Sequence, residues 1–248
     1  MGEDVAVGPV LERVGRINMM FALEQAACAP GRRRLDGAGL GVAVVAGEVE
    51  RTRARLALLS GTGVERVEWR VAASLLHQGL ASRVLSPVVA AALCHGVGIE
   101  AHRLHWDPER TGGSIALATD QGRAVRVPEG SRVLGGAADW VGRTVLDPEQ
   151  GVLGRVEAAL AGAGRVSPRL LRGNAASALV GAVGALGAGM PGWGRAGREL
   201  AGELLARPGL ELSGSCTGPA GQERFVRTTC CLYYRLGGGG LCGDCALG

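Results

Sequence analysis

The sequence predicts an α+β fold that is mainly helical, with helices around a small antiparallel sheet. The chain has 248 residues, and 47% of them are hydrophobic. This is enough to bury a sizeable core in one large domain or two small ones. Apolar residues recur at helical spacing in both halves. Short apolar runs between glycines, in the middle and near the end, are typical of strands, and this combination favours the α+β class.

Helices are expected through most of the first hundred residues. Residues 5–29, 49–59 and 65–78 each place apolar side chains on one helical face. Residues 37–45 are rich in glycine and valine and leave their state ambiguous. The Gly61-Thr62-Gly63 stretch separates the second helix from the third, because glycine favours turns over helix interiors.

Several serine–proline and aspartate–proline pairs predict helix starts. Ser86-Pro87 is expected to open a helix that runs to about Cys94. The serine can cap free N–H groups, and proline fits the first helical position because no donor is needed there. Ser167-Pro168 has the same form.

The middle of the chain predicts strands. Residues 104–106, 114–119 and 124–127 are short apolar runs. The sequence Asp120-Gln121-Gly122 lies between the second run and the third and suits a hairpin turn. We therefore expect these runs to form part of a small antiparallel sheet.

Helices return after residue 150, and two strands follow. The pattern predicts helices over residues 152–161, 168–186 and 193–205, then strands over residues 210–215 and 225–234. The second helix lies in a stretch without charge, from Gly173 to Gly194, that is long enough to span a membrane. Its many glycines, Pro191 and few large aliphatic residues favour a buried helix instead.

Charge and cysteine content narrow the class of protein. The net charge is +4, and all 27 basic residues are arginine. This excess is too small to indicate a nucleic-acid partner. No basic and apolar leader begins the chain. Seven cysteines without such a leader favour a reducing compartment and metal binding over disulfides. We therefore expect a cytoplasmic protein.

The last nineteen residues contain the candidate site: Cys230, Cys231, Cys242 and Cys245, in the spacing C-C-x10-C-x2-C. Four thiolates complete the coordination of a tetrahedral zinc or of an iron–sulfur cluster. Gly237 to Gly240 lie between the two pairs and allow a sharp turn. Spacing alone leaves zinc and iron–sulfur open, although adjacent cysteines are unusual in zinc ribbons.

This tail resembles the FhuF-like ferric siderophore reductases. Besides the cysteines, Leu232-Tyr233-Tyr234-Arg235 and residues 238–241 are similar to the family's tail. The likeness covers residues 225–247 and a second stretch, residues 169–187, in which Asn174 and Ser177 lie one helical turn apart. Gly237 is a departure, because the family pattern has proline after the equivalent of Leu236. The first hundred residues show no such likeness.

The resemblance implies a division of the chain and a cofactor. We expect a helical α+β FhuF-like domain over residues 1–220, with a C-terminal segment, residues 221–248, packed on it. The four tail cysteines would hold one [2Fe–2S] cluster. Adjacent residues of a regular strand point to opposite faces, so Cys230 and Cys231 can share a cluster only if the strand ends or bulges there.

The resemblance also implies a function and partners. The activity would be one-electron reduction of a ferric siderophore, of hydroxamate type, with release of Fe(II). An electron-donor protein such as a ferredoxin would supply the electron, and contact with the inner-membrane uptake system would be transient. No nucleotide-binding motif is recognised, since the chain has no lysine for a Walker loop. Alternatives are a non-enzymatic [2Fe–2S] electron-transfer or iron-sensing protein, a structural zinc protein, and a synthetase-like relative.

Arginines, cysteines and histidines outside the four-cysteine motif are also considered as site residues. Arg227 and Arg235 flank the first cysteine pair and are candidates to favour the reduced cluster. The other cysteines, Cys28, Cys94 and Cys216, are expected to be small buried hydrophobic residues. The four histidines, His77, His95, His102 and His105, lack the spacing of a metal site. Catalytic residues other than the cluster ligands are not predicted.

Overall fold

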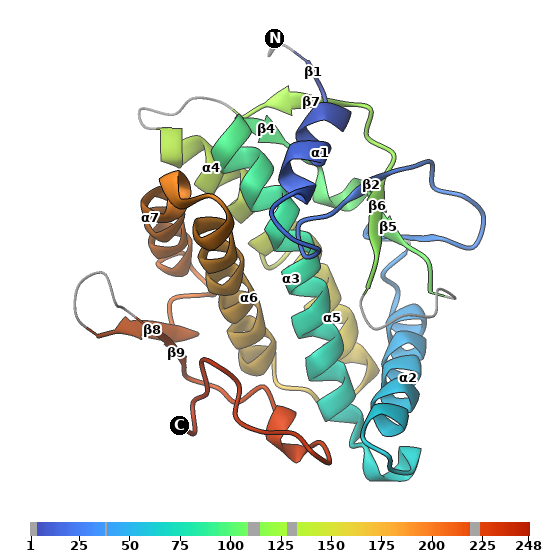
Figure 1. Cartoon of the computed structure of the whole chain (residues 1–248). Helices are drawn as coiled ribbons and strands as arrows, with labels where there is room; N and C mark the ends of the chain where they lie inside the picture. Colours follow the sequence, from blue (N-terminus) through green and yellow to red (C-terminus); the bar gives the residue numbers. More distant parts are fainter. Residues whose placement is uncertain (1–3, 38, 109–114, 128–132, 219–223) are drawn as a thin grey trace.

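The computed structural model describes residues 4–37, 39–108, 115–127, 133–218 and 224–248. Its centre is the long helix α3, Trp69–His95, around which the other helices pack (Figure 1). Most of α3 is buried, and its apolar residues spread over the whole circumference. A helix that is apolar on all sides belongs in a core rather than at a surface.

The other α-helices surround α3, and the C-terminal cysteine segment lies at the end of the molecule opposite the N-terminus (Figure 1). Helices α3 and α6 make the most extensive contact. Both contribute small residues, such as Ala73, Ala81, Ala175 and Ala178, which let the two backbones approach closely. The remaining helices are α1 (Gly8–Gly15), α2 (Val42–Leu59), α4 (Val133–Val141), α5 (Val152–Ala163), α6 (Pro168–Gly189) and α7 (Gly194–Leu205).

The strands form small sheets at the edge of the helical core, and most pairs are antiparallel. One sheet has the order β1-β7-β4, a second has β2-β6-β5-β3, and β8 pairs with β9 alone. The pair β2–β6 is parallel. The bounds are β1 (Val5–Ala6), β2 (Glu24–Gln25), β3 (Arg33–Arg34), β4 (Val97–Gly98), β5 (Leu104–Trp106), β6 (Leu117–Thr119), β7 (Arg123–Arg126), β8 (Gly214–Thr217) and β9 (Arg224–Arg227).

The predicted class, α+β and mainly helical, is confirmed, because 54% of the described structure is helical beside these small sheets. The helices expected over residues 152–161, 168–186 and 193–205 are present as α5, α6 and α7. Within the described residues, α6 is the one helix long and apolar enough to cross a membrane, and 61% of its apolar window is buried inside the protein. It therefore serves as a core helix in this fold.

The helix expected over residues 5–29 is wrong before Gly8, where Val5–Ala6 form β1, and beyond Gly15. A turn follows α1, in which the side chain of Asn18 accepts a hydrogen bond from the N–H of Met20 at 2.8 Å. Asparagine stabilises such turns by competing for backbone donors. Phe21 is fully buried although it lies outside the helix. It fits the apolar spacing of the sequence because it is buried, and not because it is helical.

The helix break expected at Ser86-Pro87 is also wrong, because α3 continues through Pro87. Ser86 does not cap a new helix; its hydroxyl donates to the Ser82 carbonyl at 2.8 Å. A proline inside a helix costs about 3 kcal/mol. Here the cost is offset by burial on both sides, since Val84, Leu85, Val88 and Val89 are 0% exposed.

The hairpin expected at residues 120–122 is wrong, because β6 and β7 belong to different sheets. Gln121 is 1% exposed, and its side chain bonds the backbone at the end of β4 and just after it. Its Oε1 accepts from the Glu100 N–H at 2.9 Å, and its Nε2 donates to the Gly98 carbonyl at 3.3 Å. The chain therefore passes between the sheets instead of turning back.

Helix α4 was not predicted, since it contains Gly135 and Gly136, which weaken helices. Packing compensates for them. The ring of Trp140 lies against Gly98, where a Cβ would be 2.6 Å away, and its indole N–H donates to the Ile99 carbonyl at 3.0 Å. A π-helical turn, Gly142–Leu146, continues α4.

Candidate metal centre

The strand that leads into the cysteines ends before it reaches them. β9 ends at Arg227 and its hairpin partner β8 begins at Gly214, so both strands are shorter than expected. Cys230 and Cys231 follow in irregular backbone, and Leu232 has a φ of 69°, a left-handed conformation that is rare outside glycine. The predicted break in regular strand pairing at the adjacent cysteines is confirmed.

The glycine-rich loop between the two cysteine pairs contains two positions that require glycine. Gly238 has a φ of 77°. At Gly239 a Cβ would lie 2.2 Å from the Tyr233 carbonyl oxygen. Gly237, where the resemblance led us to expect proline, has neither constraint, and its Cβ position is in ordinary contact with Thr62. The loop turns back through Gly238 and Gly239, so the second cysteine pair returns toward the first.

The four thiols are neighbours in a partly buried setting. Cys231 and Cys245 are each 5% exposed, and Cys230 and Cys242 are half-buried. Burial, followed by contact with the Cys231 thiol, raises the pKa of Cys242 to about 12. Burial also raises the pKa of Cys230, with a smaller rise from the charges of Cys231 and Cys245. Thiols that oppose one another's ionisation are those that a shared cation would stabilise as thiolates.

Backbone donors point at two of the sulfurs. The Leu232 N–H donates to Cys230 Sγ, and the Leu247 N–H donates to Cys245 Sγ, both at 3.3 Å. Such bonds stabilise negative charge on sulfur. In the described part of the chain, no group of three or more His, Cys, Asp or Glu side chains is arranged to hold a metal ion. The four thiols are therefore neighbours, but their sulfur atoms do not converge on a single metal position. As a donor set, four thiols fit a [2Fe–2S] cluster in number and kind.

A buried polar network fixes the cysteine segment to α3 and α6. The Ser74 hydroxyl of α3 donates to the Cys231 carbonyl at 2.7 Å. The Asn174 amide of α6 donates to the Ser74 carbonyl at 2.9 Å and contacts its hydroxyl oxygen at 3.1 Å. Ser74 and Asn174 are both 0% exposed. The first cysteine pair is therefore positioned by side chains far away in the sequence.

Arg227 belongs to the same network. Its guanidinium donates to Asn174 Oδ1 and, at 3.4 Å, to Gln78 Oε1, while Gln78 Nε2 donates to Ser177 Oγ at 3.1 Å. Its backbone N–H donates to the Asp244 carbonyl at 3.1 Å, which joins β9 to the second cysteine pair. Gly173 permits this approach, since a Cβ there would lie 2.3 Å from Thr229 Oγ1 and 3.2 Å from Arg227 Nη2.

Arg235, the other predicted arginine, has a different environment. Its Nε donates to Glu68 Oε1 at 2.7 Å, at the start of α3. The pKa of Glu68 is lowered first by its hydrogen bond to Arg70 and then by Arg235. Arg235 is exposed and ion-paired, so it ties the turn Tyr233–Arg235 to α3.

The remaining cysteines and histidines lie outside this network. Cys216 is exposed on β8, so its prediction as a buried residue is wrong; three of the four residues of β8 are exposed to solvent. Cys28 and Cys94 are half-buried, and burial raises the pKa of Cys94 to about 12. His77 is fully buried, with its Nε2 3.5 Å from Glu157 Oε1. The other oxygen of Glu157 accepts from Arg172 Nε at 2.7 Å.

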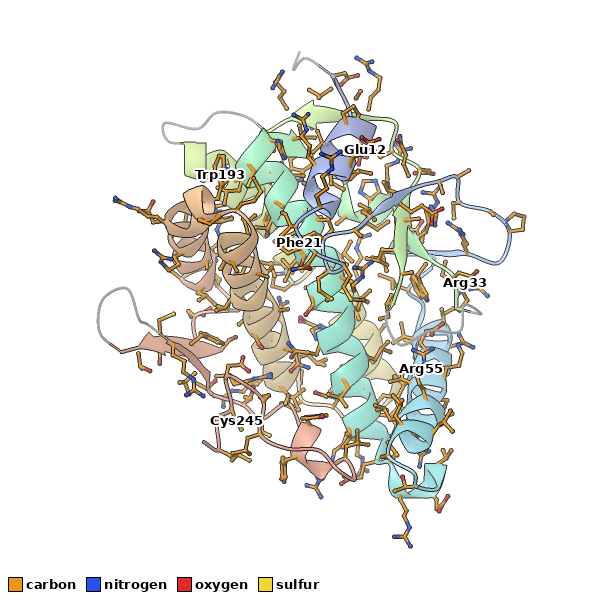
Figure 2. All side chains as sticks on the ribbon, in the orientation of Figure 1. Glu12, Phe21, Arg33, Arg55, Trp193 and Cys245 are labelled. Atoms are coloured by element: carbon orange, nitrogen blue, oxygen red, sulfur yellow. The ribbon has the colours of Figure 1, made fainter. Side chains whose placement is uncertain are left out.

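Sequence reasoning singled out Asn174, Ser177 and Arg227 but missed Ser74 and Gln78. These two lie four residues apart in α3, a spacing that places them on one helical face. No pattern in the sequence linked that face to the tail. Figure 2 shows Cys245 in the C-terminal segment, beneath the lower end of α6.

Comparison with known protein families identifies the same C-terminal segment. Residues 227–247 match the family model described as the FhuF 2Fe-2S C-terminal domain. The match begins at Arg227 and contains all four tail cysteines. The search of curated proteins gave no match. The resemblance of the tail to FhuF is confirmed, and residues 227–247 form a 2Fe–2S-binding domain.

Proposed function

We propose that this protein is a ferric siderophore reductase. The observation that carries the proposal is the FhuF-type 2Fe–2S domain at residues 227–247, anchored through a buried network to the helical core. When bound, a [2Fe–2S] cluster supplies one electron at a time. Siderophores hold Fe(III) through hard oxygen donors, and one electron converts it to Fe(II), which those donors hold weakly.

Cys230, Cys231, Cys242 and Cys245 are the proposed ligands. The support is their number, their thiol chemistry and their placement as neighbours. The N–H groups of Leu232 and Leu247 donate to two of the sulfurs. Ser74 holds the backbone of Cys231 in place. Together these contacts hold the first cysteine pair and supply one N–H donor to a sulfur of each pair.

The exposed surface of the cysteine segment supports access by partners. Tyr233, Tyr234, Leu241 and Leu247 are all between 38% and 59% exposed. A redox centre on such a segment lies near the protein surface. We propose that a donor protein such as a ferredoxin and a ferric hydroxamate both approach here, in the cytoplasm, with transient contact to the inner-membrane uptake system. No role for nucleic acid is proposed.

The test is the formation of Fe(II) by protein that has been reduced beforehand. Purified protein with its cluster is reduced, freed of reductant and mixed without oxygen with a ferric trihydroxamate and a ferrous-specific chelator. About one Fe(II) per reduced cluster is expected, since the cluster carries one electron. Protein in the oxidised state is the matched control and should form none.

Two outcomes would contradict the proposal. Zinc as the metal of a colourless protein would remove the redox chemistry altogether. A cluster that stays reduced beside the ferric trihydroxamate would favour an electron carrier or iron sensor over a reductase.

A further inference from the structure

Arg227 is a buried cation beside the cysteine segment, and no carboxylate of the described residues neutralises it. Its side chain is 2% exposed, and within the described residues it forms no ion pair. Its Nη atoms donate to the neutral amide oxygens of Asn174 and Gln78, and its Nε has no partner at all. A buried charge without an opposite charge costs several kcal/mol. An anion close to Arg227 would offset this cost.

The cysteine segment is where that anion would lie. Arg227 precedes Cys230 by three residues, and its backbone N–H bonds the carbonyl of Asp244, next to Cys245. A [2Fe–2S] cluster with four thiolate ligands carries net negative charge, and reduction adds one more. A fixed positive charge nearby therefore stabilises the reduced form more than the oxidised form.

Asn174 connects the cation to the cysteine backbone. Its oxygen accepts from Arg227, and its nitrogen donates to Ser74, whose hydroxyl holds the Cys231 carbonyl. Gln78 supplies a second neutral oxygen. Amides, unlike carboxylates, orient a guanidinium without cancelling its charge.

We propose that Arg227 is the buried counter-ion of the 2Fe–2S cluster, and that Asn174 and Gln78 are positioning residues that hold its charge beside the cysteines without neutralising it. The inference rests on the 2Fe–2S domain and deepens the proposed function, because the potential of the cluster decides which ferric complexes it can reduce. It assigns the tuning role to Arg227 and not to Arg235, whose charge is paired with Glu68.

The test is a spectroscopic redox titration of the cluster in Gln78→Glu. This change places a carboxylate beside the Arg227 guanidinium with almost no change in shape. The Ser177 hydroxyl, which now accepts from Gln78 at 3.1 Å, can rotate to donate to that carboxylate. At a fixed applied potential, the ratio of reduced to oxidised cluster should fall about tenfold, which corresponds to about 59 mV for one electron.

Substitutions of the two arginines complete the experiment. Arg227→Gln should lower the ratio in the same direction, whereas Arg227→Lys retains the charge and should stay within about threefold of wild type. Arg235→Gln is the matched control, because it removes one positive charge from the same segment at an exposed, ion-paired site; it too should stay within about threefold. If Arg227→Gln does not retain its cluster, the redox titration of Gln78→Glu alone tests the inference.

A Gln78→Glu protein with full iron and sulfide and a wild-type potential would overturn the inference. So would an equal shift in Arg235→Gln, because any nearby charge would then suffice. Failure of the proposed reductase activity would be distinguishable: the potentials would shift as expected, while no variant reduced a ferric trihydroxamate.

Discussion

Arg172 and Arg227 lie near α3 in contrasting environments, with Arg172 partly exposed and Arg227 buried. Arg172 is neutralised by Glu157 at 2.7 Å and donates to the Leu146 carbonyl at 2.8 Å. Arg227 is held by the amides of Asn174 and Gln78 instead. The first arrangement is self-contained and joins α5 to α6. The second leaves a positive charge uncompensated beside four cysteines, so the comparison separates a structural ion pair from a charge that serves the site.

The cysteines themselves should show the largest effect. Cys230→Ser and Cys245→Ser each remove one of the four proposed ligands, and we expect loss of the visible cluster spectrum and of bound iron and sulfide in both. Cys216→Ser is the control, because Cys216 is exposed on β8, and it should retain the cluster. Retention of a full cluster in Cys230→Ser would remove that residue from the ligand set and weaken the assigned partner of Arg227.

Glu157→Gln breaks the self-contained pair. It leaves the partly exposed Arg172 without its counter-charge, and the expected loss of unfolding free energy is about 3 kcal/mol, the lower end for a buried pair. Thermal unfolding measures this loss. The potential of the cluster should not move, because this pair faces α5 and not the cysteine segment. A shifted potential with little loss of stability would reverse the roles assigned to the two arginines.

Gly173→Ala tests how closely the cysteine segment must approach α6. The new methyl group would meet Thr229 Oγ1 and Arg227 Nη2, and overpacking of this kind costs about 1–3 kcal/mol. We expect a lower Tm and weaker cluster retention. Gly181→Ala is the matched control in the same helix, because its Cβ position meets nothing within 4 Å; it should be neutral or slightly stabilising.

An ion pair nearer the surface should give the smallest effect. Hydrogen bonding to Arg34 and then to Arg103 lowers the pKa of Asp120 to about 2, from 3.8. A lowered carboxyl pKa contributes stability above pH 3.8 that is lost as the pH falls toward 2. Asp120→Asn should therefore lose less than about 1 kcal/mol at pH 7. The difference from wild type should shrink in acid, as unfolding curves at several pH values would show.

The sequence predicted the regular parts of this molecule better than its connections. Helices α5, α6 and α7 follow from apolar periodicity, and the strand break follows from the geometry of adjacent cysteines. The helix start predicted at Ser86-Pro87 was wrong because local capping signals carry no information about burial, and most of α3 is buried. The hairpin predicted at residues 120–122 was wrong because the side chain of Gln121 bonds the segment near Glu100.

The residues of the candidate site also differ in how far the sequence predicts them. The tail cysteines are contiguous in sequence and recognisable by spacing. Ser74 and Gln78 act through contacts more than 140 residues away in sequence, with Cys231 and Arg227. Such contacts depend on how α3 packs against the tail, which a single sequence does not encode in any local pattern.

The central claim is that an electron held at the cysteine segment passes to a ferric siderophore. Rapid mixing of the reduced protein with the ferric and the gallium complexes of one trihydroxamate tests it most directly. Gallium(III) matches ferric iron in charge and coordination but accepts no electron. The oxidised cluster spectrum should return with the ferric complex, in step with Fe(II) formation, and not with the gallium complex. A spectrum that stays reduced with both complexes would contradict it.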